Sequence, residues 1–392
     1  MNSKSLRTAA VAAAFIAAVP AIAQTPLRVG VVAEMSGPQA EYGLQITNGM
    51  KLYLREHGDV IAGRKIELVV RDVGGANPEL AKRHAQELLV KEKVEFLAGF
   101  GFTPNALAVA PLATEAKVPM VVMNAASSGL TLRSPYIVRT SMTIAQNAHG
   151  VANWAAKNGV KRVFILYADY GPGKDGAEQF KRTFAAGGGE IVGEIAAPLR
   201  NPEFGPYMQR IKDAKPDAAF LWFPSGDLAN ALFRSYRERG LDKAGIKMLA
   251  TSDAVDDMFL NAMGDSTIGL ISGGHYSVAH DSPKNKAFVK RYQETFGTSM
   301  RPNFMAVGGY DGMHVIAEAL RQNNGKVDAD ATMRIIKSLK FESPRGPIAV
   351  DPDTRDIVQT VYIRRVEKRG AELFNVEFDK LPDVKDPFKP AP

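Results

Sequence analysis

The 392-residue sequence contains no cysteine, which excludes disulfide bonds, thiolate metal sites and cysteine nucleophiles. Beyond residue 23 it has no apolar run long enough to cross a membrane as a helix. The 49 basic residues are nearly balanced by 42 acidic ones, so the composition does not favour nucleic acid as a partner. The remaining composition, 45% hydrophobic and 23% charged, is that of a globular protein with two or three folding units.

The first 23 residues have the pattern of a cleavable secretory signal peptide. Lys4 and Arg7 precede an apolar stretch from Thr8 to Val19, and Ala21-Ile22-Ala23 matches a small-x-small cleavage site. No cysteine follows this site, so a lipid cannot be attached there. We therefore expect a soluble periplasmic protein with no direct membrane anchor, in a compartment that lacks cytoplasmic ATP and nicotinamide cofactors.

Short Val- and Leu-rich runs alternate with helical patterns twice along the chain. Buried strands are expected at Leu27–Ala33, Ile66–Val70, Val94–Ala98 and Pro119–Met123, and again at Arg162–Ala168, Glu190–Ala196, Asp217–Phe223 and Ile246–Ala250. Amphipathic helical spacing fills the gaps between them, which favours right-handed βαβ units. The sequence therefore predicts an α/β protein with two doubly wound parallel-sheet lobes.

The connections between these lobes are expected to be short, because no long Gly/Ser-rich or Pro-rich linker separates them. Crossings near 140–146, 275–280 and 352–357 would make a three-crossing hinge. The expected N-terminal lobe is 24–143 plus 277–355, and the C-terminal lobe is 144–276 plus 356–392. We also expect a hairpin at 343–347 and a loosely ordered tail from Leu381 to Pro392.

Motifs for catalysis are weak. The six histidines lack zinc-hydrolase spacing, and neither a Gly-x-Ser-x-Gly elbow nor a Walker phosphate loop is present. Residues 171–176 match G-x-G-x-x-G, but Pro, Lys and Asp occupy the variable positions, which favours a glycine-rich start of a helix over a dinucleotide site. We therefore expect no enzyme activity, no cofactor and no metal.

The loops that follow two predicted strands of the first half are small and polar. In Gly99–Asn105, Thr103 can cap a helix that starts at Pro104, and the free N–H groups of such a helix suit a carboxylate. In Asn124–Gly129, small side chains let a ligand reach the backbone. Because ligands bind at the carboxyl ends of parallel strands, the two loops together predict a ligand site.

The second half offers an aromatic ring and carboxylates at the same strand-end positions. Tyr170, Asp227 and Asp253 follow predicted strands, and the two carboxylates could equally be helix N-caps. Tyr42, just after the first strand, could contact the ligand or only pack. A pocket of this kind could bind a small, partly apolar carboxylate.

With these residues in view, the sequence resembles the leucine/isoleucine/valine-binding family of periplasmic solute-binding proteins over nearly all of the mature chain. Three stretches carry the resemblance: 28–38 (RVGVVAEMSGP), 169–173 (DYGPG) and 305–312 (MAVGGYDG). It implies a type I bilobed fold with three crossings, no catalysis, and a role as the solute-binding component of an ABC importer that delivers its ligand to permease subunits.

The resemblance also implies a set of ligand-binding residues. In the first lobe these are Phe102, Thr103, Asn124, Ala125, Ala126 and Ser127, with Tyr42 near the cleft mouth; in the second lobe they are Tyr170, Ser225 and Asp253. The acid that would bind an amino-acid ammonium falls at Ser252 or Asp253, and Pro224 or Ser225 stands where a tyrosine is expected. The sequence is also similar to members that take up aromatic acids, for which no ammonium partner is needed.

We therefore expect a transport receptor for a branched-chain or related amino acid, with an aromatic acid as the alternative ligand. Two other roles stay open at this point. One is a sensory module that presents its ligand to a separate receptor, and the other is an exported hydrolase built on the same scaffold.

Overall fold

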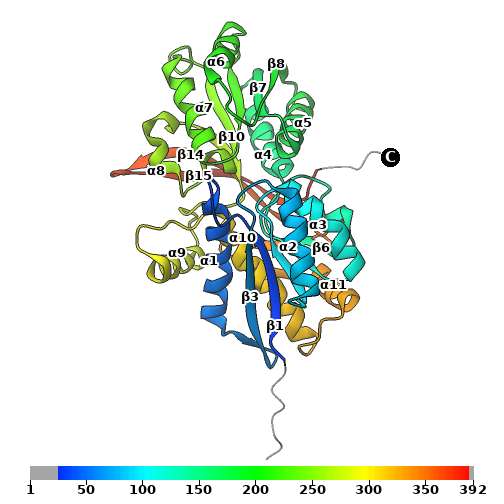
Figure 1. Ribbon diagram of the computed structural model, residues 1–392. Coiled ribbons are helices and arrows are strands. Elements are labelled where there is room, and N and C mark those ends of the chain that lie inside the picture. The colour runs from blue at the N-terminus through cyan, green and yellow to red at the C-terminus, as the bar shows by residue number, and fades with distance from the viewer. Residues whose placement is uncertain (1–24, 388–392) are drawn as a thin grey trace, which may run out of the picture.

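The computed structural model describes residues 25–387, which form two α/β lobes, one above the other in Figure 1. The predicted signal peptide, 1–23, lies outside the described residues. In the described part of the first lobe, a six-stranded sheet has the order β2-β3-β1-β4-β5-β6. Its strands are β1 (Leu27–Ala33), β2 (Val60–Ile61), β3 (Arg64–Asp72), β4 (Phe96–Gly99), β5 (Met120–Val122) and β6 (Ile137–Arg139). All pair in parallel except β2 with β3.

Helices cover both faces of this sheet, as expected for a doubly wound lobe. The helices of this lobe are α1 (Ala40–His57), α2 (Pro78–Val90), α3 (Thr103–Ala116), α9 (Pro283–Phe296), α10 (Phe304–Gln322) and α11 (Ala329–Lys337), with a 3₁₀ turn, η1, at Thr131–Arg133. Of these, α9 packs on α1 and α11 on α10. One apolar cluster, which includes Val32, Leu88 and Val109, lies between the sheet and helices α2 and α3. The helix α10, 19 residues long and almost wholly buried, packs along α1 on the other face.

A larger, mixed sheet forms the second lobe and continues across the junction into β12 and β13, which lie on the first-lobe side of the proposed boundary. In the residues described, its order is β12-β13-β14-β11-β10-β9-β7-β8, with β15 paired to β14. The strands are β7 (Arg162–Ala168), β8 (Glu190–Ala197), β9 (Ala218–Trp222), β10 (Lys247–Thr251), β11 (Ile271–Gly274), β12 (Lys340–Ser343), β13 (Gly346–Val350), β14 (Ile357–Arg369) and β15 (Glu372–Val384). The helices are α4 (Ile144–Lys157), α5 (Gly171–Ala186), α6 (Phe204–Asp213), α7 (Asp227–Glu238) and α8 (Leu260–Met263), with 3₁₀ turns η2 (Ser252–Val255) and η3 (Gly264–Thr267).

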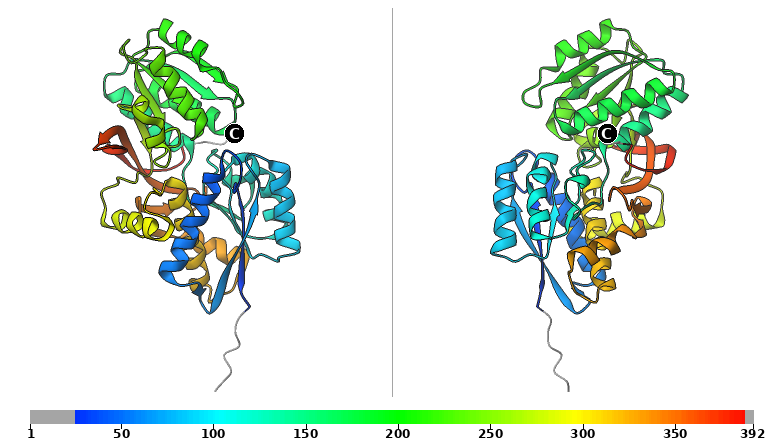
Figure 2. Two further views of the ribbon diagram at one scale, coloured as in Figure 1. Left: turned by 60° about the vertical axis from the view of Figure 1, so that its left-hand side comes forward. Right: turned by 90° about the vertical axis from the view of Figure 1, so that its right-hand side faces the viewer.

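The chain passes between the lobes from β6 to α4, from β11 to α9 and from β13 to β14. Hydrogen bonds tie these connections together: Arg345 Nη2 donates to Thr140 O at 2.6 Å, and Gln146 Nε2 donates to Ile357 O at 2.8 Å. Both views of Figure 2 place the orange-red β14–β15 ribbon beside this junction. The predicted fold class is confirmed, and we keep the lobe boundaries at 143/144, 276/277 and 355/356 as a proposal.

The hairpin predicted at 343–347 is confirmed, because β12 and β13 pair with Ser343 opposite Gly346. The expectation of a loosely ordered tail from Leu381 is wrong for its first residues. Residues up to Val384 belong to β15, and the Val384 carbonyl accepts a hydrogen bond from Gln146 Nε2 at 2.8 Å. Pairing with a long neighbouring strand orders a segment whose own composition is polar.

The glycines of the G-x-G-x-x-G motif start helix α5, as the sequence predicts. A Cβ at Gly173 would lie 2.1 Å from the Ala168 carbonyl oxygen, so only glycine lets the helix begin this close to the end of β7. The close packing of the start of α5 against the end of β7 therefore explains the motif.

Candidate functional site

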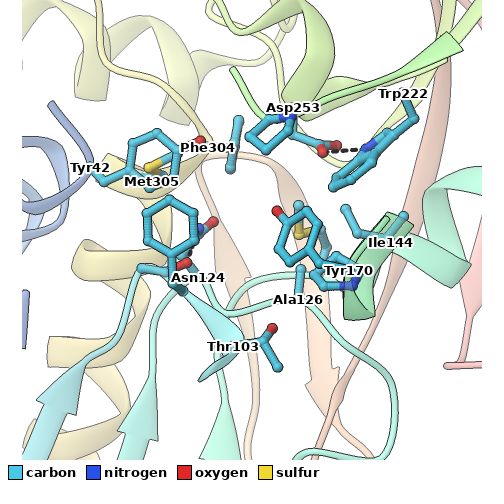
Figure 3. Close-up of a pocket in the computed structure, with 15 residues that line it drawn as sticks. Tyr42, Thr103, Asn124, Ala126, Ile144, Tyr170, Trp222, Asp253, Phe304 and Met305 are labelled. Atoms are coloured by element: carbon cyan, nitrogen blue, oxygen red, sulfur yellow. Dashed lines mark hydrogen bonds between the residues drawn. The ribbon is translucent and has the colours of Figure 1, made fainter. Parts of the chain in front are cut away.

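A cavity lies between the lobes, at the carboxyl ends of the strands of both sheets (Figure 3). Its walls come from both lobes and from the first crossing. They are Tyr42, Gly101, Phe102, Thr103, Asn124, Ala126, Phe304 and Met305 from the first lobe, Met142 and Ile144 from the crossing, and Tyr170, Pro172, Trp222, Pro224 and Asp253 from the second. A ligand in this cavity would contact both lobes at once.

Thr103 is the first residue of α3, and the residue that caps this helix is Phe102. The prediction that Thr103 caps a helix starting at Pro104 is therefore wrong by one residue. The Thr103 Oγ1 instead accepts a hydrogen bond from the Ser127 N–H at 3.2 Å, which fixes the second loop against the start of the helix. The main-chain N–H groups of Thr103 and Ala126 donate to no other group in the described chain. Both residues line the cavity, so this end can donate hydrogen bonds to an anion.

Glu34 lies behind this end of the cavity, fully buried after β1. Its Oε1 accepts a hydrogen bond from Asn105 Nδ2 at 2.9 Å. A Cβ at Gly101 would lie 2.1 Å from Glu34 Oε2, so glycine is required where the loop passes over this carboxyl. Burial raises the pKa of Glu34 to about 7, because desolvation disfavours its charged form.

Aromatic rings form much of the wall on both sides. Tyr42 stacks on Phe102 with the ring centroids 5.2 Å apart and the planes 9° from parallel. Across the cavity, Tyr170 lies 5.6 Å from Trp222, centroid to centroid. The Tyr42 hydroxyl is 3.0 Å from Ser225 Oγ, which makes a hydrogen bond from one lobe to the other. The lobes therefore meet over a cavity that has aromatic rings on both sides.

Asp253 is the carboxylate among the residues that line the cavity. Its Oδ2 accepts a hydrogen bond from Trp222 Nε1 at 2.5 Å, drawn in Figure 3, and its Oδ1 accepts one from Thr251 Oγ1 at 2.6 Å. Burial raises its pKa to about 6, because desolvation outweighs these hydrogen bonds. The side chain does not cap a helix, and neither does that of Asp227, since Gly226 is the cap of α7. That alternative from the sequence is wrong for both residues: Asp227 lies one residue inside α7, and the oxygens of Asp253 accept their hydrogen bonds from Trp222 and Thr251.

The structure places seven of the predicted binding residues in the cavity wall and three outside it. The seven are Tyr42, Phe102, Thr103, Asn124, Ala126, Tyr170 and Asp253. Of the others, Ala125 is buried beneath the loop, Ser127 contacts Thr103, and Ser225 contacts Tyr42. Ser252, the alternative to Asp253, instead accepts a hydrogen bond from Asn147 Nδ2 at 2.9 Å. The roles of these residues in binding stay predictions.

Sequence reasoning missed Trp222, Met142, Ile144, Phe304 and Met305 in the wall. Trp222 ends a strand that the sequence predicts, and its position at a strand end was a signal that could have been used. The other four carried no local signal, because they reach the cavity only through the packing of α10 and the first crossing.

Among residues 25–387, no cluster of three or more histidine, aspartate or glutamate side chains could hold a metal ion. No helix in that same range is long and apolar enough to cross a membrane.

Comparison with known proteins places the chain in a family. Residues 26–371 match the family model described as periplasmic binding protein. The chain is 40% identical to Leu/Ile/Val-binding protein homolog 6 of Brucella abortus over 98% of both chains. A solute-binding protein of an ABC transporter from Rhodopseudomonas palustris BisB5, solved with 3,4-dihydroxybenzoic acid, is 53% identical with a TM-score of 0.88, covering 93% of this chain and 99% of that one.

A second R. palustris solute-binding protein, solved with 4-hydroxybenzoate, is 45% identical with a TM-score of 0.90, covering 92% of this chain and 98% of that one. With a family model that spans most of the chain and relatives similar over nearly its whole length, this chain belongs to the periplasmic binding protein family, as a Leu/Ile/Val-binding-type solute-binding protein of an ABC transporter.

Proposed function

We propose that this solute-binding protein binds a small aromatic carboxylate and delivers it to the permease subunits of an ABC importer. The observation that carries the proposal is the state of Asp253 in an otherwise mostly aromatic and apolar cavity. Both of its oxygens already accept a hydrogen bond from the protein itself, from Trp222 and Thr251. An aromatic ring needs stacking partners and no ammonium partner, and the cavity supplies rings from both lobes.

The carboxylate of such a ligand fits the end of the cavity formed by Thr103 and Ala126. The N–H of Thr103 is a donor at the start of α3, where the helix dipole also favours negative charge, and the N–H of Ala126 is a donor from the loop after β5. The opposite end, at Asp253, repels a carboxylate because both groups would be anionic in a buried site. This charge distribution gives the ligand one orientation, with its carboxylate toward the first lobe.

A branched-chain amino acid is the competing ligand, and the names of the Brucella relatives favour it. Its ammonium would have to compete with the indole N–H and the threonine O–H for the oxygens of Asp253. The solved relatives point the other way: one was solved with 3,4-dihydroxybenzoic acid, one with 4-hydroxybenzoate, and a third, 27% identical with a TM-score of 0.82, with benzoate. Together with the aromatic walls, they favour the aromatic acid.

Binding would act through closure of the two lobes. A ligand that contacts Phe102 and Thr103 on one side and Tyr170 and Trp222 on the other stabilises the closed arrangement by its additional contacts there. A micromolar Kd corresponds to about −8 kcal/mol, which charge-assisted hydrogen bonds and burial of one ring can supply. The family implies that this occurs in the periplasm, before delivery to the permease.

Isothermal titration calorimetry on the unliganded mature chain tests the proposal. The panel is benzoate, 4-hydroxybenzoate, cyclohexanecarboxylate, leucine and phenylalanine. We expect at least one benzoate to bind with a micromolar or lower Kd, and leucine to bind at least about 100-fold more weakly. Cyclohexanecarboxylate is the control for the ring, because it has the same charge without the aromatic faces. Tighter binding of leucine than of either benzoate, or no binding of any benzoate, would refute the proposal.

A further inference from the structure

The carboxylate of Asp253 is fixed in place as a hydrogen-bond acceptor at the second-lobe end of the cavity. The Trp222 N–H and the Thr251 O–H donate to its two oxygens, and only 6% of the residue is exposed. Each carboxylate oxygen has two acceptor positions, so one donor on each leaves capacity for a further donor. Figure 3 shows Asp253 facing the cavity from the second lobe, opposite Thr103 of the first.

The other buried carboxylates of this region are engaged elsewhere. Asp256 accepts hydrogen bonds from Asn303 Nδ2 at 2.7 Å and from the Met258 N–H at 2.8 Å, and it does not line the cavity. Asp257 accepts one from Asn375 Nδ2 at 2.8 Å, also outside the cavity. The acceptor that a ligand meets at this end is therefore Asp253.

Because the pKa of Asp253 is raised only to about 6, its side chain is mostly ionised at neutral pH. An ionised carboxylate in a buried wall discriminates among substituents on the far side of the ring. It accepts a hydrogen bond from a hydroxyl, leaves a ring hydrogen without a polar partner, and repels a second carboxylate.

Resting on the proposed function, we propose that Asp253 is a specificity-determining residue that accepts a hydrogen bond from a ring hydroxyl of the ligand. The protein would thus select hydroxylated aromatic monocarboxylates over benzoate and over aromatic dicarboxylates. The first-lobe N–H groups of Thr103 and Ala126 bind the carboxylate. At the other end of the ring, Asp253 distinguishes between substituents by accepting a hydrogen bond from a hydroxyl.

Calorimetry with four ligands that differ in one substituent tests this inference: benzoate, 4-hydroxybenzoate, 4-methoxybenzoate and terephthalate. A fifth ligand, 3-hydroxybenzoate, shows which ring position places the hydroxyl within reach of Asp253. A hydrogen bond to a charged group corresponds to roughly 10- to 100-fold in affinity. We expect a hydroxybenzoate to bind about that much more tightly than benzoate, and the methyl ether and the dicarboxylate to bind more weakly than benzoate. The methyl ether is the control for the donated hydrogen, because it has an oxygen at the same ring position but no hydrogen to donate to Asp253.

The variant Asp253→Asn replaces the charged acceptor by a neutral one of the same shape. We expect it to reduce the preference for the hydroxyl by about 5-fold or more and to weaken the rejection of terephthalate, with a smaller change in benzoate binding. Asp227→Asn is the matched control: it removes the same charge from the exposed first residue of α7 in the same lobe, outside the cavity. It should leave all the affinities unchanged.

The outcomes separate the two proposals. If benzoate and both hydroxybenzoates bind equally to the wild type, the selectivity inference fails while the aromatic-acid function stands. If Asp253→Asn weakens the binding of every ligand by the same factor, Asp253 supports the cavity wall without distinguishing between ring substituents, and the inference also fails. If no aromatic acid binds, the proposed function itself fails. Should the variant not fold, the wild-type ligand series alone decides, since a methyl ether that binds as well as the hydroxyl overturns the inference.

Discussion

Replacing Tyr42 by phenylalanine removes one hydroxyl from the junction between the lobes and leaves the ring in place. The wild-type hydroxyl is 3.0 Å from Ser225 Oγ, which belongs to the other lobe. The ring of residue 42 would still stack on Phe102, 5.2 Å away. The substitution therefore tests the contact between lobes without removing an aromatic wall.

The expected magnitude follows from the hydrogen bond alone. A neutral hydrogen bond contributes about 0.5–1.5 kcal/mol net, and it forms only when the lobes are closed. When the lobes open, water solvates both hydroxyls. Destabilising the closed state by that amount weakens the apparent affinity by about 2- to 10-fold, because binding requires closure. The stability of each lobe should be unchanged.

A double-mutant cycle with Tyr42→Phe and Ser225→Ala measures the interaction free energy between the two hydroxyls. The affinity for the tightest-binding benzoate is measured by calorimetry in the four proteins, and small-angle scattering reports the radius of gyration with and without ligand. We expect a coupling free energy of about 0.5–1.5 kcal/mol between the two positions. Additive effects of the two substitutions would show that the hydroxyls do not contribute to closure, and the reasoning would be refuted.

Three further predictions follow from the same contacts. Tyr170→Ala should weaken binding of an aromatic acid by about 10-fold or more, measured by calorimetry, because it removes a ring from the second-lobe wall; an unchanged Kd would contradict this. Gly173→Ala should lower the free energy of unfolding in urea by about 1–3 kcal/mol, since its Cβ would lie 2.1 Å from the Ala168 carbonyl; unaltered stability would show that the helix can shift. Burial raises the pKa of Glu34 from 4.5 to about 7 and that of Asp256 from 3.8 to about 8. Above about pH 6.5 the unfolded chain has lost the protons of both carboxyls and its histidines are largely neutral, whereas the folded protein still holds carboxyl protons. Stability should therefore fall as pH rises, by about 1.4 kcal/mol per pH unit for each protonated carboxyl, up to about pH 7 for Glu34 and about pH 8 for Asp256; urea denaturation between about pH 6.5 and 8 checks the sign, and a rise would refute it.

Much of the fold could be predicted because parallel strands buried on both faces leave a strong local signal. The run Arg162–Ala168 is a strand with the bounds that the sequence predicts, and it begins the second alternation of strands and helices. β11, at Ile271–Gly274, was missed because Ser and Gly dominate it. It is a strand because β10 and β14 pair with it from either side, which no local pattern records.

The candidate site could also be predicted only in part. The loops that contain Thr103 and Asn124 could be found from the sequence, since small polar residues after a buried strand mark the binding edge of an α/β sheet. The identity of the acid that faces the cavity could not, because Ser252 and Asp253 are adjacent and their side chains point to different neighbours. Phe304 joins the wall from a helix about 200 residues away from Thr103 in sequence.

The two α/β lobes, the family and the edge at which we expect a ligand to bind could be derived from the amino-acid sequence, because hydrophobic periodicity, short motifs and strand-end loops are local properties. The side chains that meet across the junction could be identified only in the folded protein. The hydrogen bond between Tyr42 and Ser225 depends on how the two lobes pack together, because the two residues lie on different lobes. The donors that fix Asp253 depend on the pairing of β9 with β10 inside the second lobe, which brings Trp222 beside Asp253.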